Sequence, residues 1–94
     1  MTHHPELELL EYLQAQDEPL GIALLLFDAD NNADNFRRAC HAIATMIREE
    51  QIVLKERDGA ECRVLEAWKV RVALADKSNW QHSAVSSFFL CLKT

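Results

Sequence analysis

The stretch ADNFRRACHAIATMIREEQIVLKERDGAECRVL, residues 33–65, decides the fold that this chain is expected to adopt. In its first half, apolar side chains recur every three or four residues, which is the spacing of one buried helix face. Those side chains are Phe36, Ala39, Cys40, Ile43, Ala44, Met46 and Ile47. In its second half, two runs of β-forming residues flank Asp58 and Gly59, a pair typical of a two-residue type I′ turn. The stretch therefore predicts a helix over about residues 33–50 that leads into a β-hairpin over 52–65, with Val53 facing Val64 and Lys55 facing Cys62.

The residues before this stretch predict two shorter helices. Pro5 opens a segment in which apolar residues recur at helical spacing, so we expect a helix from about Pro5 to Gln16. The run from Leu20 to Phe27 is apolar on every side, and its Ala and Leu content favours a helix over a buried strand. Residues 28–35 are rich in Asp and Asn, which form turns and cap helices.

The residues after the hairpin predict a third strand and one ambiguous segment. Trp68, Val70, Val72 and Leu74 alternate with Lys and Arg, which is typical of a half-buried strand. The helical spacing in the last segment involves Trp80, Ala84, Phe88 and Leu92, whereas Phe88, Leu90 and Leu92 alternate as in a strand. We expect a helix from near Asn79 and keep the strand as the alternative.

Length and composition indicate one small globular domain over residues 1–94. The chain has 94 residues, of which 49% are hydrophobic, with two Gly and two Pro. No apolar run is long enough to span a membrane and no secretory signal is recognisable, so we expect a cytoplasmic protein that does not contact membranes. The three Cys are widely spaced, which favours reduced thiols over disulfides or a zinc site.

No pattern indicates catalysis or a bound metal. Asp28, Asp30, Asn32 and Asp34 have the spacing of the first ligands in an EF-hand loop. Ala33 stands where that loop needs Gly, however, so helix capping is the favoured interpretation. Motifs for nucleophilic, phosphate-binding or zinc-dependent enzymes are missing from the sequence. We therefore expect a protein without catalytic activity, metal or cofactor.

The order of a helix, a short helix, a polar turn, a longer helix and a hairpin resembles the winged helix-turn-helix superfamily over about residues 5–66. The resemblance implies an α+β fold of three helices plus a β-hairpin wing, extended over residues 67–94 by a third strand and a C-terminal helix or strand. It also implies that the helix over 34–50 enters the major groove of double-stranded DNA while the wing over 52–65 contacts the backbone. The side chains implied to bind DNA are Asn35, Arg37, Arg38, His41, Thr45 and Arg48 on the helix and Lys55, Arg57 and Arg63 on the wing.

Charge supports two classes of function. Residues 1–35 carry eight Asp and Glu and no Lys or Arg, whereas residues 36–94 carry all ten Lys and Arg and seven acids. The cationic second half agrees with the first hypothesis, a small DNA-binding transcriptional regulator. The acidic first half agrees with the alternative, a protein-interaction module or small inhibitor or immunity-type protein that binds a basic partner.

The apolar C-terminal side chains also have two interpretations. They either complete the core or pair two copies of the chain as a homodimer, because a small domain cannot easily bury all of them. The side chains expected at such a dimer interface are Trp80, Phe88, Phe89 and Leu92.

Overall fold

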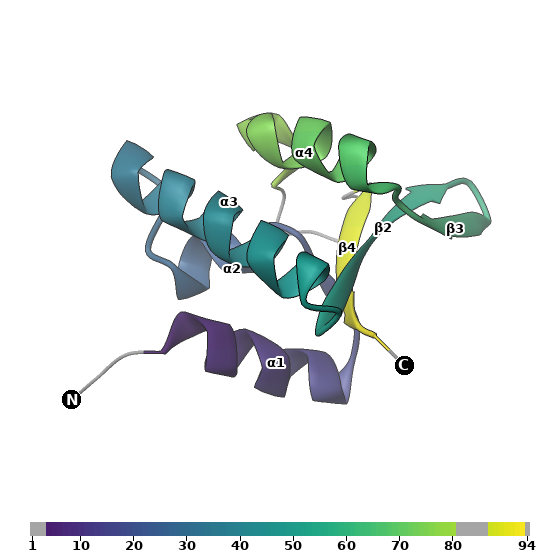
Figure 1. Cartoon of the computed structure of the whole chain (residues 1–94), viewed down its shortest axis with the longest axis horizontal. Coiled ribbons are helices and arrows are strands. Elements are labelled where there is room, and N and C mark those ends of the chain that lie inside the picture. Colours follow the sequence, from purple (N-terminus) through teal and green to yellow (C-terminus); the bar gives the residue numbers. More distant parts are fainter. Residues whose placement is uncertain (1–3, 81–86, 94) are drawn as a thin grey trace.

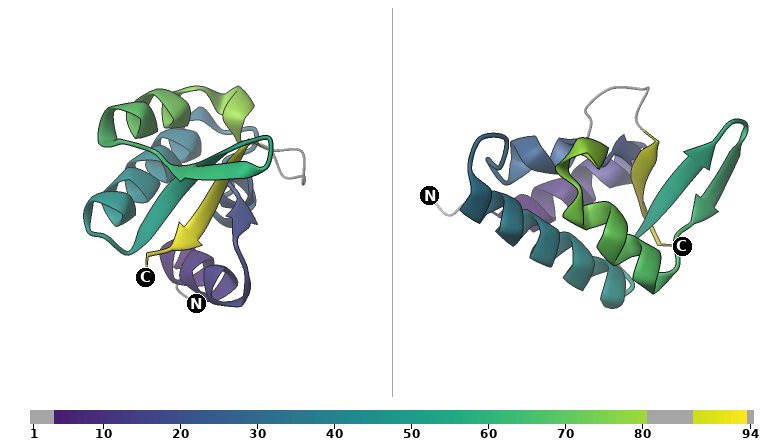
Figure 2. Two further views of the ribbon diagram at one scale, coloured as in Figure 1. Left: turned by 90° about the vertical axis from the view of Figure 1, so that its right-hand side faces the viewer. Right: turned by 90° about the horizontal axis from the view of Figure 1, so that it is seen from above.

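The structure is a computed structural model that describes residues 4–80 and 87–93. It has an α+β fold in which helices pack against one face of a four-stranded antiparallel sheet (Figure 1, Figure 2). The elements in chain order are α1 (Pro5–Ala15), β1 (Glu18–Pro19), α2 (Ile22–Leu26), α3 (Ala33–Arg48), β2 (Ile52–Asp58), β3 (Glu61–Val64), α4 (Ala67–Ala75), the short 3₁₀ helix η1 (Lys77–Asn79) and β4 (Phe88–Leu92). None of the described helices has both the length and the apolar character that crossing a membrane requires.

The first three helices confirm the helices expected before the hairpin, and local hydrogen bonds fix both ends of α3. The side chain of Asn32 accepts a hydrogen bond from the backbone N–H of Asn35 at 3.0 Å, which caps the first turn. At the other end, the backbone N–H of Gln51 donates to the carbonyl of Met46 at 3.0 Å. Glu50 lies between them with a φ of 63°, the left-handed conformation that closes many helices.

The last strand of the chain lies in the middle of the sheet. The strand order is β1-β4-β2-β3, so β4 separates β1 from β2. β4 pairs with β2 from Ile52 opposite Leu92 to Glu56 opposite Phe88. Leu54 and Leu90 are paired at the centre, and their side chains are 1% and 0% exposed. The sheet is therefore held together by residues from the two ends of the chain as well as by the hairpin.

One core joins the sheet to the helices. Its largest fully buried side chains come from α1, the turn before α2, α3 and both central strands, and they are Leu9, Leu20, Ile43, Ile52, Leu54 and Leu90. Further along the core-facing side of α3, the ring of Phe36 packs edge-on against Trp80 with centroids 5.0 Å apart. This arrangement places α3 at the centre of the helical layer, with α1 and α4 on either side of it (Figure 1).

The strand expected over residues 68–74 is wrong, because these residues form α4. Val70, Ala73 and Leu74 are buried, whereas Trp68 and Val72 are 61% and 65% exposed. Burial thus follows the i, i+3, i+4 spacing of a helix rather than the alternation of a strand. The alternation of apolar and charged residues was compatible with both, and β4 takes the place of this segment in the sheet.

The hairpin is present, but its expected register is wrong. Lys55 lies opposite Val64 and Arg57 lies opposite Cys62, so Lys55 does not face Cys62 and Val53 does not face Val64. Asp58 is the last residue of β2 and pairs with Glu61, which leaves Gly59 as the first central residue of the turn. Only Gly59 of the turn residues has a positive φ, at 62°. A type I′ turn centred on Asp58 would force a positive φ on the aspartate as well.

The expectation of a helix from near Asn79 is also wrong for the end of the chain. Residues 88–92 form β4, and the strand alternative accounts for them. Pairing on both sides decides this outcome, because β4 exchanges backbone hydrogen bonds with β1 and β2. The part of the expectation that falls on residues 81–86, including Ala84, lies outside the described residues.

Candidate functional site

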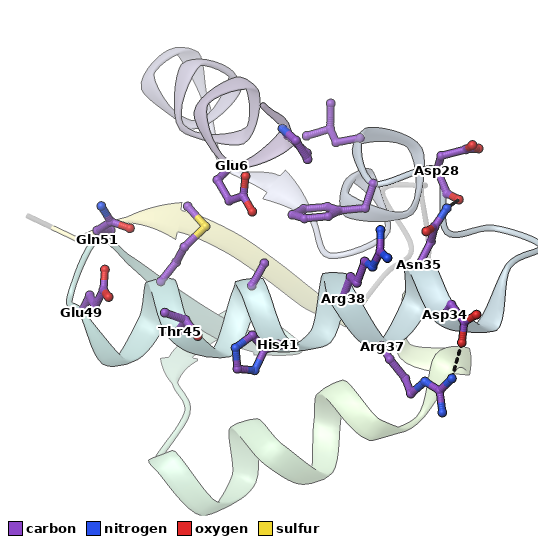
Figure 3. Close-up of a pocket in the computed structure, with 15 residues that line it drawn as sticks. Glu6, Asp28, Asp34, Asn35, Arg37, Arg38, His41, Thr45, Glu49 and Gln51 are labelled. Atoms are coloured by element: carbon purple, nitrogen blue, oxygen red, sulfur yellow. Dashed lines mark hydrogen bonds and ion pairs between the residues drawn. The ribbon is translucent and has the colours of Figure 1, made fainter. Parts of the chain in front are cut away.

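An open groove with a volume of about 990 Å³ lies between α1 and α3. We call it the α3 groove. Its walls are the first residues of α1, the end of α2 with the turn that follows, and one side of α3 up to Gln51 (Figure 3). The lining residues are Pro5, Glu6, Leu26, Phe27, Asp28, Asp34, Asn35, Arg37, Arg38, His41, Ala42, Thr45, Met46, Glu49 and Gln51.

The turn between α2 and α3 forms one end of the groove. Asp28 has a φ of 53°, so the chain turns sharply as α2 ends. The side-chain amide of Asn35 donates a hydrogen bond to the carbonyl of Asp28 at 2.9 Å. This bond ties the end of α2 to the first turn of α3. The Asn-rich and Asp-rich turn therefore caps and positions helices, as its composition predicts.

The groove has apolar side chains within a charged rim. Leu26 and Met46 are buried and Phe27 is half-buried, and these three supply apolar surface to the lining. Acids stand around it on three elements: Glu6 on α1, Asp28 and Asp34 beside the turn, and Glu49 at the end of α3. This composition resembles sites that take an apolar side chain into a pocket and hold charges around it.

The two arginines of the rim behave differently. Arg37 lies at the edge of the groove, where its guanidinium forms an ion pair with Asp34 (Figure 3). Arg38 points from α3 into the space between α3 and α1. With Arg37 and Asp34 paired, the acids Glu6, Asp28 and Glu49 face one further Lys or Arg among the described lining residues, Arg38, so this described rim is acidic.

No family model, curated protein or solved structure matches this chain.

The structure gathers five of the residues expected to bind DNA and separates the others. Asn35, Arg37, Arg38, His41 and Thr45 all line the α3 groove. The remaining four, which lie elsewhere, are Arg48, Lys55, Arg57 and Arg63. All the expected helix residues except Arg48 thus line one groove, but the acids of the rim line it too.

The cations of the hairpin are divided between its two faces. Lys55 and Arg57 point to the face of the sheet opposite the buried Leu54, because side chains alternate along a strand. There the guanidinium of Arg57 lies 4.8 Å from the centre of the Phe89 ring. Arg63 points to the other face and lies 3.6 Å from the carboxylate of Asp58. The expected cationic wing is therefore not a single surface.

The side chains expected at a dimer interface are largely engaged within one chain. Trp80 is 3% exposed, and its indole N–H donates a hydrogen bond to the carbonyl of Leu74 at 3.1 Å. Phe88 and Leu92 pack against the core, and Phe89 is half-buried beside Arg57. Their apolar surface thus contributes mainly to the core of the single domain.

The acids on the groove rim were not recognised as site residues from the sequence. Asp28 and Asp34 were interpreted as capping residues, and neither Glu6 nor Glu49 was assigned a role of its own. The signal that was available is the excess of acids in residues 1–35, which predicts an acidic surface without locating it. Among residues 4–80 and 87–93, no three His, Cys, Asp or Glu side chains are placed to hold a metal ion.

Proposed function

We propose that this protein is a protein-interaction module whose α3 groove binds a short, basic, amphipathic helix of a partner protein. The observation that carries the proposal is the charge of the rim, where Glu6, Asp28 and Glu49 surround an apolar lining and, among the described residues, Arg38 is the one cation not paired with a rim acid. Helix-in-groove recognition combines these two features, because apolar anchors enter the groove while charges on the flanks fix orientation. A volume of about 990 Å³ accommodates several such anchors.

Duplex DNA fits this groove less well than a basic helix. Phosphates would approach the same carboxylates, and repulsion between like charges costs affinity and slows association. Arg37 forms an exposed ion pair with Asp34, and Arg63 lies 3.6 Å from the carboxylate of Asp58, so both cations already have an acid beside them that a phosphate would have to approach. The chain's net charge of −5 acts in the same direction at long range.

The test is a titration of the protein with two synthetic helical peptides of equal length. One combines Leu with Lys, and the other combines Leu with Glu. We expect the Lys peptide to bind and to perturb the backbone NMR signals of Arg38, His41 and Thr45, with affinity falling as salt screens the rim. The Glu peptide should bind at least about tenfold more weakly. Equal binding of the two peptides, or perturbed signals away from the groove, would contradict the proposal.

Charge-reversal variants test the contribution of the rim acids to binding. The double variant Glu6→Lys/Glu49→Lys should weaken binding of the Lys peptide about tenfold, because two rim attractions become repulsions. Glu11→Lys changes an exposed acid of α1 that does not line the groove, so it should leave the affinity within about twofold. A similar loss in both variants would mean that only net charge matters.

A DNA-binding winged helix is the second candidate, and one observation favours it. The hairpin of β2 and β3 follows α3 directly and extends beyond the rest of the molecule, as a wing does (Figure 2). Duplex DNA at about 20 mM salt belongs in the same titration. Salt-sensitive binding that is lost in Arg38→Ala and Arg57→Ala, without binding of the Lys peptide, would favour this function over the groove.

A further inference from the structure

β3 forms an open edge of the sheet. Within residues 4–80 and 87–93 it pairs with β2 on one side only, and it is the outermost strand in the order β1-β4-β2-β3. The side chains from Ala60 to Val64 are all exposed. The opposite edge, β1, is only two residues long. β3 is therefore the longer of the two free edges, and free edges of this kind pair readily with another strand.

Alternation along β3 shows which backbone groups are available. The N–H of Leu65 donates to the carbonyl of Leu54 at 2.9 Å, so Leu65 and every second residue before it direct their backbone groups toward β2. Those residues include Glu61 and Arg63. The N–H and C=O groups of Cys62 and Val64 therefore point outward, away from the sheet. An added antiparallel strand would hydrogen-bond to these two residues.

The charges of β3 are complementary to those of a second, antiparallel copy of β3. When Cys62 is placed opposite Cys62 of the second copy, Glu61 lies opposite Arg63 of that copy, and Arg63 lies opposite its Glu61. Neither residue directs backbone groups to the new strand, so each pair is a non-hydrogen-bonded pair, in which side chains approach most closely. Ala60 then lies opposite Val64, which places a small side chain against a branched one.

The isolated hairpin leaves Glu61 in an unfavourable position that such pairing relieves. Within the hairpin Glu61 lies directly opposite Asp58, a like charge, and it forms no ion pair within residues 4–80 and 87–93. Like charges directly opposite each other destabilise a sheet. Arg63 of a second copy would supply the missing opposite charge. Pairing would also remove part of the apolar side chain of Val64, which is 58% exposed, from contact with water.

We propose that two copies of this protein associate through β3 in this antiparallel, two-fold register, which joins two four-stranded sheets into one of eight strands. The symmetry is closed, because the same strand serves as both surfaces. The interface uses neither the α3 groove nor the side chains of Trp80 and Phe88. The dimer would thus present two grooves to partners.

The first test is the mass of the protein by sedimentation from about 10 μM to about 1 mM, a range suited to a small interface. We expect a monomer–dimer equilibrium. A short bismaleimide should link two copies through Cys62, because backbone hydrogen-bonded pairs lie about 5.5 Å apart between Cα atoms. Cys62→Ser should abolish the link. A strict monomer throughout, or a cross-link that persists in Cys62→Ser, would overturn the proposal.

Charge reversal on β3 tests the register itself. Glu61→Arg and Arg63→Glu should each raise the dissociation constant of the dimer about tenfold or more, since two attractions become two repulsions. A mixture of the two variants should associate again, because each chain then meets the opposite charges in both pairs. Recovery in the mixture also shows that both variants are folded. Failure of the mixture to associate would overturn this register.

Glu11→Arg is the matched control and should not alter the dissociation constant. The groove variant Glu6→Lys/Glu49→Lys should likewise leave association unchanged, so failure of the proposed function and failure of this inference are distinguishable. If Phe89→Ala disrupts the dimer and Glu61→Arg does not, the interface is formed by the C-terminal apolar residues. That result would contradict pairing through β3.

Discussion

At the scale of single residues, the three cysteines show how position determines chemistry. The thiol of Cys40 donates a hydrogen bond to the carbonyl of Leu74 at 3.3 Å, and burial raises its pKa above the ordinary value of 9.0. Burial also raises the pKa of Cys91, although the nearby charge of Lys55 opposes the shift. Cys62 is exposed on β3. All three are free thiols, as the sequence predicts.

We therefore expect only one thiol to react rapidly with a maleimide at pH 7. Mass spectrometry of proteolytic peptides should identify the labelled residue as Cys62. The other two should react after unfolding, because the thiolate is the nucleophile and burial disfavours it. The raised pKa values also predict that the contribution of these two protonated thiols to stability is full below the unfolded pKa of 9.0 and is lost as the pH rises through their folded pKa values, since the unfolded thiols ionise first. Rapid labelling of Cys40 or Cys91 in the folded protein would contradict the described packing.

At the scale of elements, the ends of helices and strands depend on a few backbone conformations. Glu50 and Gly59 both have left-handed φ values, of 63° and 62°. Gly59 adopts this conformation without strain, whereas Glu50 carries a Cβ that opposes it. The first closes α3 before β2, and the second turns the hairpin.

These two positions predict opposite effects of exchanging glycine. Glu50→Gly should raise the free energy of unfolding by about 0.5–1 kcal/mol, because Gly adopts the left-handed conformation without strain. The ion pair with Lys93 that is lost is exposed and contributes little. Gly59→Ala should lower it by about 1 kcal/mol from backbone strain alone, since no atom lies within 4 Å of the added Cβ. Urea titrations measure both changes. Equal signs would contradict the backbone conformations described for these turns.

At the scale of the whole molecule, the central position of β4 makes the end of the chain part of the core. Leu90 is completely buried between the helices and the sheet, opposite Leu54. β4 also connects β1 to β2, so the sheet would be divided without it. Within the sheet, β4 thus connects β1, which follows the acidic helix α1, to the hairpin of β2 and β3.

Leu90→Ala should lower the free energy of unfolding by about 2–5 kcal/mol, because it removes buried apolar atoms and leaves a cavity. Leu25→Ala is the matched control, since Leu25 is 64% exposed and its loss should change stability by less than about 0.5 kcal/mol. Denaturant midpoints compare the two variants directly. A small effect of Leu90→Ala would show that β4 is not required for the core.

The sequence by itself determined the features that depend on neighbouring residues. The amphipathic pattern of residues 33–48 predicts α3, and Asp58 with Gly59 predicts the hairpin, because both signals act over a few positions. The tertiary structure alone decided that residues 68–74 form a helix and residues 88–92 a strand, since both patterns suited either structure until long-range pairing selected one. It also decided the candidate site: the acids of the groove come from α1, the α2–α3 turn and the end of α3, and only folding brings charges so distant in sequence around one apolar lining.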